Sequence, residues 1–180
     1  MGDLNQFYFV LNNKNLVKGP ILEIGSKDYG NTQDFRSLFP NFDYIGVDME
    51  EGKGVDIIAD FTDDLDNLKE KLSDRKFKTI FCFSVLEHCK YPFKMCDNIS
   101  NILEKDGFIF IGVPFSWRIH GYPSDYWRFT SEGIKILFPN VDFEPYKSNI
   151  ASRIKETRDI SDEMFKIDIW KSKNKQYQRK

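Results

Sequence analysis

Short apolar runs alternate with amphipathic segments along most of this 180-residue chain, and that alternation limits the fold more than any other feature. The apolar runs, each predicted to be a strand, are 19–25, 43–48, 55–60, 78–85 and 108–114. The amphipathic segments, each predicted to be a helix, are 4–13, 32–39, 63–72, 92–107 and 131–138. Strands that are apolar along their whole length are typical of a parallel sheet covered by helices on both faces. We therefore expect an α/β fold with a doubly wound, mostly parallel sheet.

The alternation stops near the end of the chain. Segments 141–147 and 164–171 have the composition of strands, but no convincing helical pattern separates them. Two strands without a helical crossover between them favour an antiparallel pair. The sequence thus predicts a seven-stranded sheet with an antiparallel hairpin at its C-terminal edge.

Nothing in the sequence divides the chain into two domains. It has no internal repeat, low-complexity stretch or Pro/Gly-rich linker, and its length suits one domain. We expect a single domain over residues 1–180, with an N-terminal helical region at 1–18 and a disordered basic tail at 172–180.

Charge and cysteine content argue against several kinds of protein. Lysine and arginine number 26 against 28 acidic residues, a net charge of −2, whereas binding to nucleic-acid phosphates normally requires a basic surplus. No window approaches the ~20 apolar residues of a membrane span, and the first residues lack the features of a signal peptide. Three cysteines without close pairs are typical of reduced thiols. The expected location is the cytoplasm.

Ligands of a doubly wound sheet bind beyond the carboxyl ends of its strands, so the residues after each strand are the candidates. The first strand leads through Glu23 into Gly25 and Ser26, with Gly30 shortly after. Small residues there let a ligand approach the backbone, although a glycine pair is often only a turn. The spacing is not the G-x-G-x-x-G of dinucleotide-binding proteins, because Lys27 occupies the middle position.

Acidic residues end the next two predicted strands. Asp48 follows the glycine turn by about twenty residues, where it either accepts two ribose hydroxyls or is a surface residue. Asp60 and Phe61 suit an adenine, because the acid could bind the amino group of the base and the aromatic ring could stack on its face. Alternatively, Asp60 caps a helix and Phe61 packs in the core.

Taken in order, these residues resemble the class I S-adenosylmethionine-dependent methyltransferases. The matching segments are ILEIGSKDYG, YIGVDMEEGKGVDIIAD, IFCFSVLEH, LEKDGFIFIGVPF and HGYPSDYWRFTSEG, which cover most of residues 20–138. The first loop and the YIGVD…GVD stretch are similar to a small single-domain branch of surface-polysaccharide and glycan gene clusters. The first loop departs from the usual G-x-G-x-G of the family.

The resemblance implies S-adenosylmethionine as the cofactor and assigns its contacts to the ends of four strands. The implied residues are Glu23, Gly25, Ser26 and Gly30 for the methionine part, Asp48 and Met49 for the ribose, Asp60 and Phe61 for the adenine, and Phe83 and Ser84 for the amino group.

Both histidines of the chain, His88 and His120, follow predicted strands at this edge. Histidine is a common base near neutral pH, although a loop histidine is often merely solvated. His120 lies in segment 116–130, which mixes aromatic and charged side chains as pockets for polar rings do. The alternative is a lid that packs its aromatics on the sheet and pairs Asp125 with Arg128. We predict that His120 is the catalytic base, and His88 or Asp125 is the alternative candidate for that role.

The same region supplies the predicted acceptor-binding residues, which are Glu87, Tyr122, Tyr126, Trp127 and Arg128. A related group of methyltransferases holds a divalent cation with E-x-x-E-H at this place. Here Ser84 stands where the first acid would be, so we expect no metal.

The sequence therefore predicts methyl transfer to a small-molecule acceptor, with O-methylation of a sugar or glycan precursor as the specific form. The alternatives are a non-catalytic module that binds S-adenosylmethionine or S-adenosylhomocysteine and, less favoured, an RNA methyltransferase. If the cofactor-binding core occupies about residues 20–171, as the resemblance implies, we expect no separate substrate domain within these 180 residues. Acceptor recognition is expected from segment 116–130, the N-terminal helix, residues 148–163 or a second subunit of a homodimer.

Overall fold

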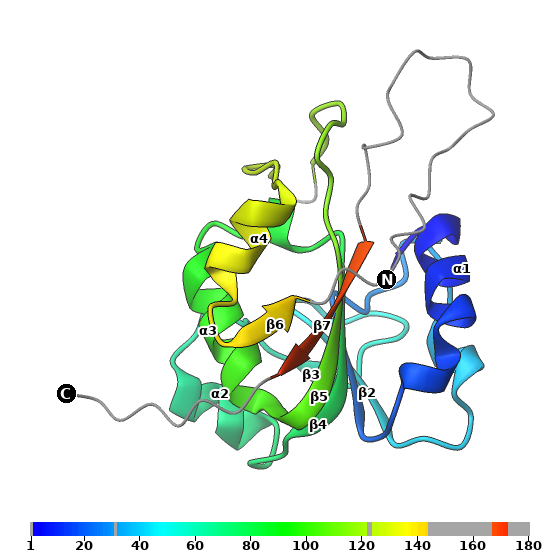
Figure 1. The fold of residues 1–180 in the computed structure, drawn as a ribbon. Helices are drawn as coiled ribbons and strands as arrows, with labels where there is room; N and C mark the ends of the chain where they lie inside the picture. Colours follow the sequence, from blue (N-terminus) through cyan, green and yellow to red (C-terminus); the bar gives the residue numbers. More distant parts are fainter. Residues whose placement is uncertain (1, 31, 122–123, 144–166, 173–180) are drawn as a thin grey trace.

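The computed structural model describes residues 2–30, 32–121, 124–143 and 167–172. A single sheet lies at its centre (Figure 1). Its strands are in the order β3-β2-β1-β4-β5-β7-β6. Its parallel part consists of β1 (Ile21–Ile24), β2 (Tyr44–Asp48), β3 (Ile57–Ile58), β4 (Phe77–Phe83) and β5 (Leu103–Gly112). The winding reverses between β1 and β4, as in a doubly wound fold. The predicted α/β fold with a parallel sheet is confirmed.

The last two strands along the chain, β6 and β7, form an antiparallel pair at one edge of the sheet. Strand β7 (Ile167–Ser172) pairs antiparallel with β5 and with β6 (Val141–Phe143). The remaining residues of the predicted segments 141–147 and 164–171, the stretch 148–163 and residues 173–180 of the basic tail lie outside the described residues.

Helices cover both faces of the sheet (Figure 1). Helix α1 (Leu4–Asn12) packs on one face, and α2 (Leu65–Lys71), α3 (Pro92–Ile102) and α4 (Ser131–Leu137) pack on the other. The side chain of Thr130 caps α4 by accepting a hydrogen bond from the Gly133 amide at 3.0 Å. Short 3₁₀ turns occur at η1 (Lys14–Leu16), η2 (Arg36–Leu38) and η3 (Leu86–His88). Among the described residues no helix is both long and apolar enough to cross a bilayer.

Alternate residues of β4 divide the core into two clusters of different composition. Ile80 and Cys82 belong to a largely aliphatic cluster under α2, α3 and α4. Phe81 and Phe83 belong to a mostly aromatic cluster under α1, in which the rings of Phe35 and Phe83 stack at 5.1 Å. A strand that is buried on both faces explains why residues 80–83 are all apolar.

Two predicted helices differ from the structure. Residues 32–39 form only the turn η2, because Phe35 and Phe39 both anchor in the aromatic cluster and Pro40 follows at once. Helix α3 ends at Ile102, five residues before the predicted end, because Leu103 already pairs with Phe77 in the sheet. Gly107 is consequently a residue of β5 and does not cap a helix.

Candidate active site

The loop after β1 is held close to its neighbours at Gly25. This residue has φ +73°, and its amide donates to the carbonyl of Val47 at 2.9 Å. A Cβ atom here would lie 2.4 Å from Cγ2 of Val85, so no other residue fits without a shift. Gly30 also has a positive φ of +87°, but the space around it is open. The glycine turn therefore holds the first loop close to the carboxyl ends of the strands, where a ligand can approach the backbone of the loop.

Asp48 joins this loop to the end of β2. Its carboxylate accepts hydrogen bonds from the backbone amides of Lys27 at 3.1 Å and Met49 at 2.8 Å. The side chain is only partly buried and Met49 is 64% exposed, so the edge of the sheet is open here.

Glu23 and Ser26 lie beneath the loop instead of on its surface. Glu23 is buried and accepts a hydrogen bond from the hydroxyl of Tyr44 at 2.8 Å, and burial raises the pKa of this carboxyl group. The Ser26 hydroxyl oxygen is fully buried and has no hydrogen-bond partner among the described residues. Both residues shape the floor of the loop.

The predicted adenine residues lie after β3 in different environments. Asp60 accepts hydrogen bonds from the amide and the hydroxyl of Thr62, each at 2.7 Å, and is partly buried. The ring of Phe61 is 4% exposed and packs in the aliphatic cluster, as the core-contact alternative has it. With the Phe61 ring in the core and its carbonyl accepting a hydrogen bond from Asn98 at 2.8 Å, Asp60 is the partly exposed residue of the pair.

At the end of β4 the backbone is strained. Ser84 has φ +54°, which is uncommon for a residue other than glycine. Its hydroxyl accepts a hydrogen bond from Nε2 of Gln6 in α1 at 3.2 Å, while the preceding Phe83 is buried in the aromatic cluster. Helix α1 thereby fixes the turn that the family resemblance would place at the cofactor's amino group.

Of the residues predicted for the cofactor, Gly25, Asp48 and Ser84 lie where a ligand could reach them, whereas Glu23, Ser26, Phe61 and Phe83 have buried side chains. Strands β2, β1 and β4 are neighbours and run parallel, so Asp48, Gly25 and Ser84 lie at one edge of the sheet. A close-approach backbone at Gly25 and a partly exposed acid at Asp48 are what a nucleoside-bearing cofactor requires.

The segment after β5 is docked onto η3 through its backbone. The amides of Tyr126 and Trp127 donate to the carbonyl of Glu87 at 2.8 and 3.2 Å, and Nε1 of Trp127 donates to the carbonyl of Cys89 at 2.8 Å. Tyr126 and Trp127 remain 49% and 41% exposed. The Trp127 ring also stacks against Phe129, with the centroids 6.3 Å apart, and Tyr122 lies outside the described residues.

Asp125 and Arg128 hold this segment together from inside. The Asp125 side chain is 2% exposed and pairs with both terminal nitrogens of Arg128, which lowers the pKa of the Asp125 carboxyl group. Arg128 also donates to the carbonyls of Trp117 and Arg118, each at 3.2 Å. The predicted pairing of these two residues within a lid is therefore present, and Arg128 is engaged within the segment.

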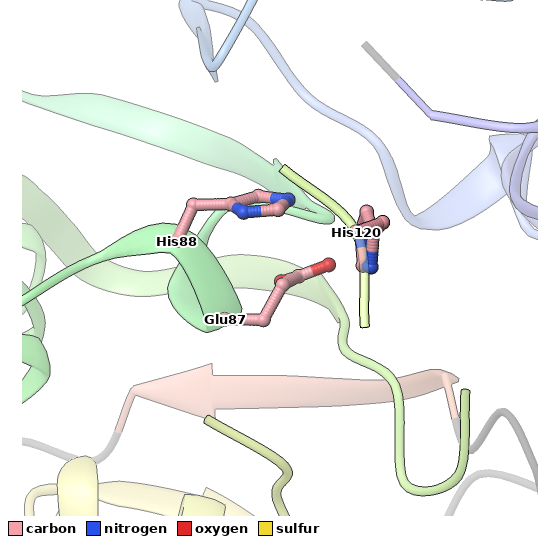
Figure 2. A group of neighbouring side chains, drawn as sticks. All are labelled: Glu87, His88 and His120. Atoms are coloured by element: carbon pink, nitrogen blue, oxygen red, sulfur yellow. The ribbon is translucent and has the colours of Figure 1, made fainter. Parts of the chain in front are cut away.

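Glu87, His88 and His120 converge although they come from two different loops (Figure 2). One ligand-capable atom from each lies within 4.8 Å of the other two, and the histidine rings meet edge to face with their centroids 4.8 Å apart. Glu87 is 1% exposed, and burial raises its pKa to about 8. Burial lowers the pKa of His88, whose Nδ1 lies 2.7 Å from the carbonyl oxygen of Ser124.

The sequence analysis named all three residues and put both histidines at one edge of the sheet, but it did not group them with Glu87 as one cluster. The strand order could have predicted this cluster, because Glu87 and His88 follow β4, His120 follows β5, and these two strands are parallel neighbours. Carboxyl ends of adjacent parallel strands lie side by side, so residues soon after them can meet.

This topology, with a glycine turn after β1 and an acid at the end of β2, defines the class of Rossmann-like methyltransferases. The family model described as a methyltransferase domain matches residues 4–143. The chain therefore belongs to the methyltransferase-domain family, which confirms the predicted class I S-adenosylmethionine-dependent methyltransferase. The glycan-cluster branch remains a prediction.

Solved structures with the same fold are distant in sequence. An S-adenosylmethionine-dependent methyltransferase from Clostridium acetobutylicum superposes with a TM-score of 0.65 at 12% identity, covering 97% of this chain and 93% of the other. N-methyltransferase NodS from Bradyrhizobium japonicum, in complex with S-adenosylhomocysteine, gives 0.60 at 14%, covering 94% and 86%. The 1,6-didemethyltoxoflavin-N1-methyltransferase of Burkholderia thailandensis gives 0.61 at 13%, covering 95% and 78%. No curated protein matches the sequence.

Proposed function

We propose that this methyltransferase transfers the methyl group of S-adenosylmethionine to a hydroxyl oxygen of a small molecule, with a sugar or glycan precursor as the acceptor class. The observation that carries the proposal is the position of the two histidines. They follow β4 and β5, next to the β1, β2 and β4 ends that carry Gly25, Asp48 and Ser84. An acceptor beside the histidines would therefore adjoin the cofactor.

Proton removal distinguishes a hydroxyl acceptor from other acceptors. S-adenosylmethionine supplies an electrophilic methyl group, so the chain must align the acceptor and take up its proton. The His120 Nδ1 atom lies 3.0 Å from Asp125 Oδ2 and 3.2 Å from the carbonyl oxygen of Arg118, which favours a proton on Nδ1. In the protein without further ligands, Nε2 of His120 is then the base that accepts the hydroxyl proton.

The acceptor class is argued from the docked segment 124–130. Tyr126 and Trp127 are partly exposed aromatic residues beside polar groups, a combination that suits a sugar ring. Two of the distant structures are named as N-methyltransferases, and a nitrogen acceptor is the outcome that would correct this part of the proposal.

Two finer predictions belong to the same proposal. The first is the seven-stranded sheet with its antiparallel C-terminal edge, which the pairing of β7 with β5 and β6 supports. The second is a cytoplasmic location, supported by three unpaired cysteines.

The proposal is tested by measuring transfer of labelled methyl groups to three sets of acceptors: nucleotide sugars, small amines and short RNAs. We expect product with the sugars, loss of turnover in His120→Ala and unchanged binding of S-adenosylhomocysteine by calorimetry. Lys90→Ala, an exposed change near the same loop, is the matched control. Binding without any product would identify a non-catalytic module, and product with RNA alone would identify an RNA methyltransferase.

A further inference from the structure

Glu87, His88 and His120 present three metal-ligating groups to a common point at the carboxyl edge of the sheet. Figure 2 shows the Glu87 carboxylate and a nitrogen of the His88 ring turned toward the His120 ring. Carboxylate oxygens and imidazole nitrogens are ligands of first-row divalent ions.

The hydrogen bonds of the two histidines leave the right nitrogen atoms available. His88 donates from Nδ1 to the carbonyl of Ser124 at 2.7 Å. His120 has Nδ1 beside Asp125 Oδ2 at 3.0 Å and the carbonyl of Arg118 at 3.2 Å, which are both acceptors. With Nδ1 protonated in each ring, each Nε2 carries a lone pair. A proton on the far nitrogen, donated to a carbonyl or a carboxylate, is the arrangement that supports metal-ligating histidines.

One oxygen of the buried Glu87 side chain also lacks a hydrogen-bond partner within the described part of the chain. Its Oε2 atom is buried and has no hydrogen-bond partner among the described residues. A buried polar oxygen without a partner destabilises the fold unless another group satisfies it. One proton on Glu87 could serve only one of the two imidazole lone pairs, whereas a cation between the three groups would serve all of them.

We propose that Glu87, His88 and His120 bind a divalent transition-metal ion of the Zn²⁺ type, with open coordination positions for an oxygen of the acceptor. Two imidazoles favour such an ion over Mg²⁺, which prefers oxygen ligands. Three protein ligands with an open position are typical of catalytic zinc sites. Ligand atoms around such an ion lie roughly 3.3 Å apart for bonds of about 2.0–2.2 Å. From separations within 4.8 Å, the side chains close on the ion by up to about 1.5 Å.

The role of the ion toward the acceptor rests on the proposed function, but its binding does not. With the ion bound, the Nε2 atom of His120 is a ligand and not a base. If the metal-free protein still transfers methyl groups, His120 remains the proposed base. If transfer returns only when the ion is added back, the ion binds the acceptor oxygen instead.

The binding test uses the full chain without a polyhistidine tag, because its own two histidines are then the only imidazoles present. After treatment with a chelator and dialysis, the protein is titrated with Co²⁺ by visible absorption and with Zn²⁺ by calorimetry. We expect one ion per chain. His88→Ala, His120→Ala and Glu87→Gln should each abolish the one-to-one signal, and Asp125→Asn should weaken binding about 10-fold by loosening His120.

Two controls keep the result specific. Cys89→Ser should leave the Co²⁺ spectrum unchanged, since a thiolate ligand would give an intense ligand-to-metal band that the variant loses. Far-ultraviolet circular dichroism and S-adenosylhomocysteine calorimetry on each variant test whether the fold and the cofactor site survive. A folded variant that loses the metal but still binds S-adenosylhomocysteine supports the proposal.

Three results would overturn the metal site. They are no ion bound by the unchanged chain, full binding by folded His120→Ala and Glu87→Gln, or tighter binding of Mg²⁺ than of Zn²⁺. If the unchanged chain does not bind S-adenosylhomocysteine, the proposed function is contradicted, but the proposal of a metal site is not affected.

Discussion

Asp125 accepts a hydrogen bond from the backbone amide of His120 at 2.9 Å, and the same oxygen, Oδ2, lies 3.0 Å from Nδ1 of that histidine. One carboxylate thus fixes both the backbone and the ring of His120, while its pairing with Arg128 keeps it ionised. The orientation of His120 toward Glu87 and His88 is therefore set by Asp125.

Replacing Asp125 with Asn tests this relationship. The amide can still accept from His120, but it loses the charge that pairs with Arg128 and presents a donor to one side of it. We expect the free energy of unfolding to fall by about 1–3 kcal/mol and turnover to fall more than cofactor affinity. Thermal unfolding, kcat and S-adenosylhomocysteine calorimetry measure the three quantities.

The matched control for Asp125 is Glu132→Gln. Glu132 pairs with Lys135 at the surface with its side chain 75% exposed, so its loss should change stability by no more than about 0.5 kcal/mol. Equal effects of the two substitutions would contradict the role given to Asp125.

Asp48 should control affinity for the cofactor. In Asp48→Asn one ionised acceptor is lost, and charge-assisted hydrogen bonds contribute about 1.5–3 kcal/mol, so calorimetry should find S-adenosylhomocysteine binding at least about 10-fold weaker. Glu51→Gln, an exposed change three residues away, should bind as the unchanged chain does. Undiminished binding by Asp48→Asn would remove Asp48 from the cofactor site.

Two glycines with positive φ separate backbone strain from steric conflict. Gly25→Ala incurs both, because its Cβ would lie 2.4 Å from Val85, whereas Gly30→Ala at φ +87° meets open space. A left-handed non-glycine residue costs about 1–2 kcal/mol, so Gly30→Ala should lose about that much in urea unfolding and Gly25→Ala clearly more. Similar losses would mean that the loop moves away from Val85 at little cost.

The sequence predicted the parallel sheet because β1, β4 and the second half of β5 are mostly apolar on both faces and are bounded by turn residues. It failed at residues 32–39 because Phe35 and Phe39 have helical spacing, yet both serve as anchors for a loop in the aromatic cluster. A spacing of four residues fits either outcome, and only the tertiary contacts decide between them.

The candidate site divides in a similar way. Topology alone puts His88 and His120 at one edge, since they follow neighbouring strands. The loop conformation that brings Arg128 to the carbonyls of Trp117 and Arg118, and so buries Asp125, depends on contacts that spacing does not encode. The burial of Phe61 was likewise decided by packing under α3, where Asn98 binds its carbonyl at 2.8 Å.

The aromatic cluster should carry a large share of the stability. Phe81 is fully buried and stacks on Phe35, Phe39 and Phe83 at 5.9 Å each, so Phe81→Ala should lower the free energy of unfolding by about 3–5 kcal/mol. Phe93→Ala removes the same atoms from a ring that is 64% exposed on α3 and should cost less than about 1 kcal/mol. Urea unfolding of both variants measures the difference, and equal midpoints would contradict the packing described for β4.

The three cysteines should react slowly in the folded protein. Cys82, Cys89 and Cys96 are buried, and burial raises the pKa of each thiol, so the thiolate that attacks a disulfide reagent is scarce at any mildly alkaline pH. Ellman's reagent should therefore detect three thiols per chain in urea but react with the native chain only as fast as it opens. Raising the pH from neutral to mildly alkaline should speed the reaction of a free thiol far more than that of the native chain. Rapid native reaction of one thiol, abolished by Cys89→Ser, would mean that η3 and the docked Trp127 open readily and expose Cys89.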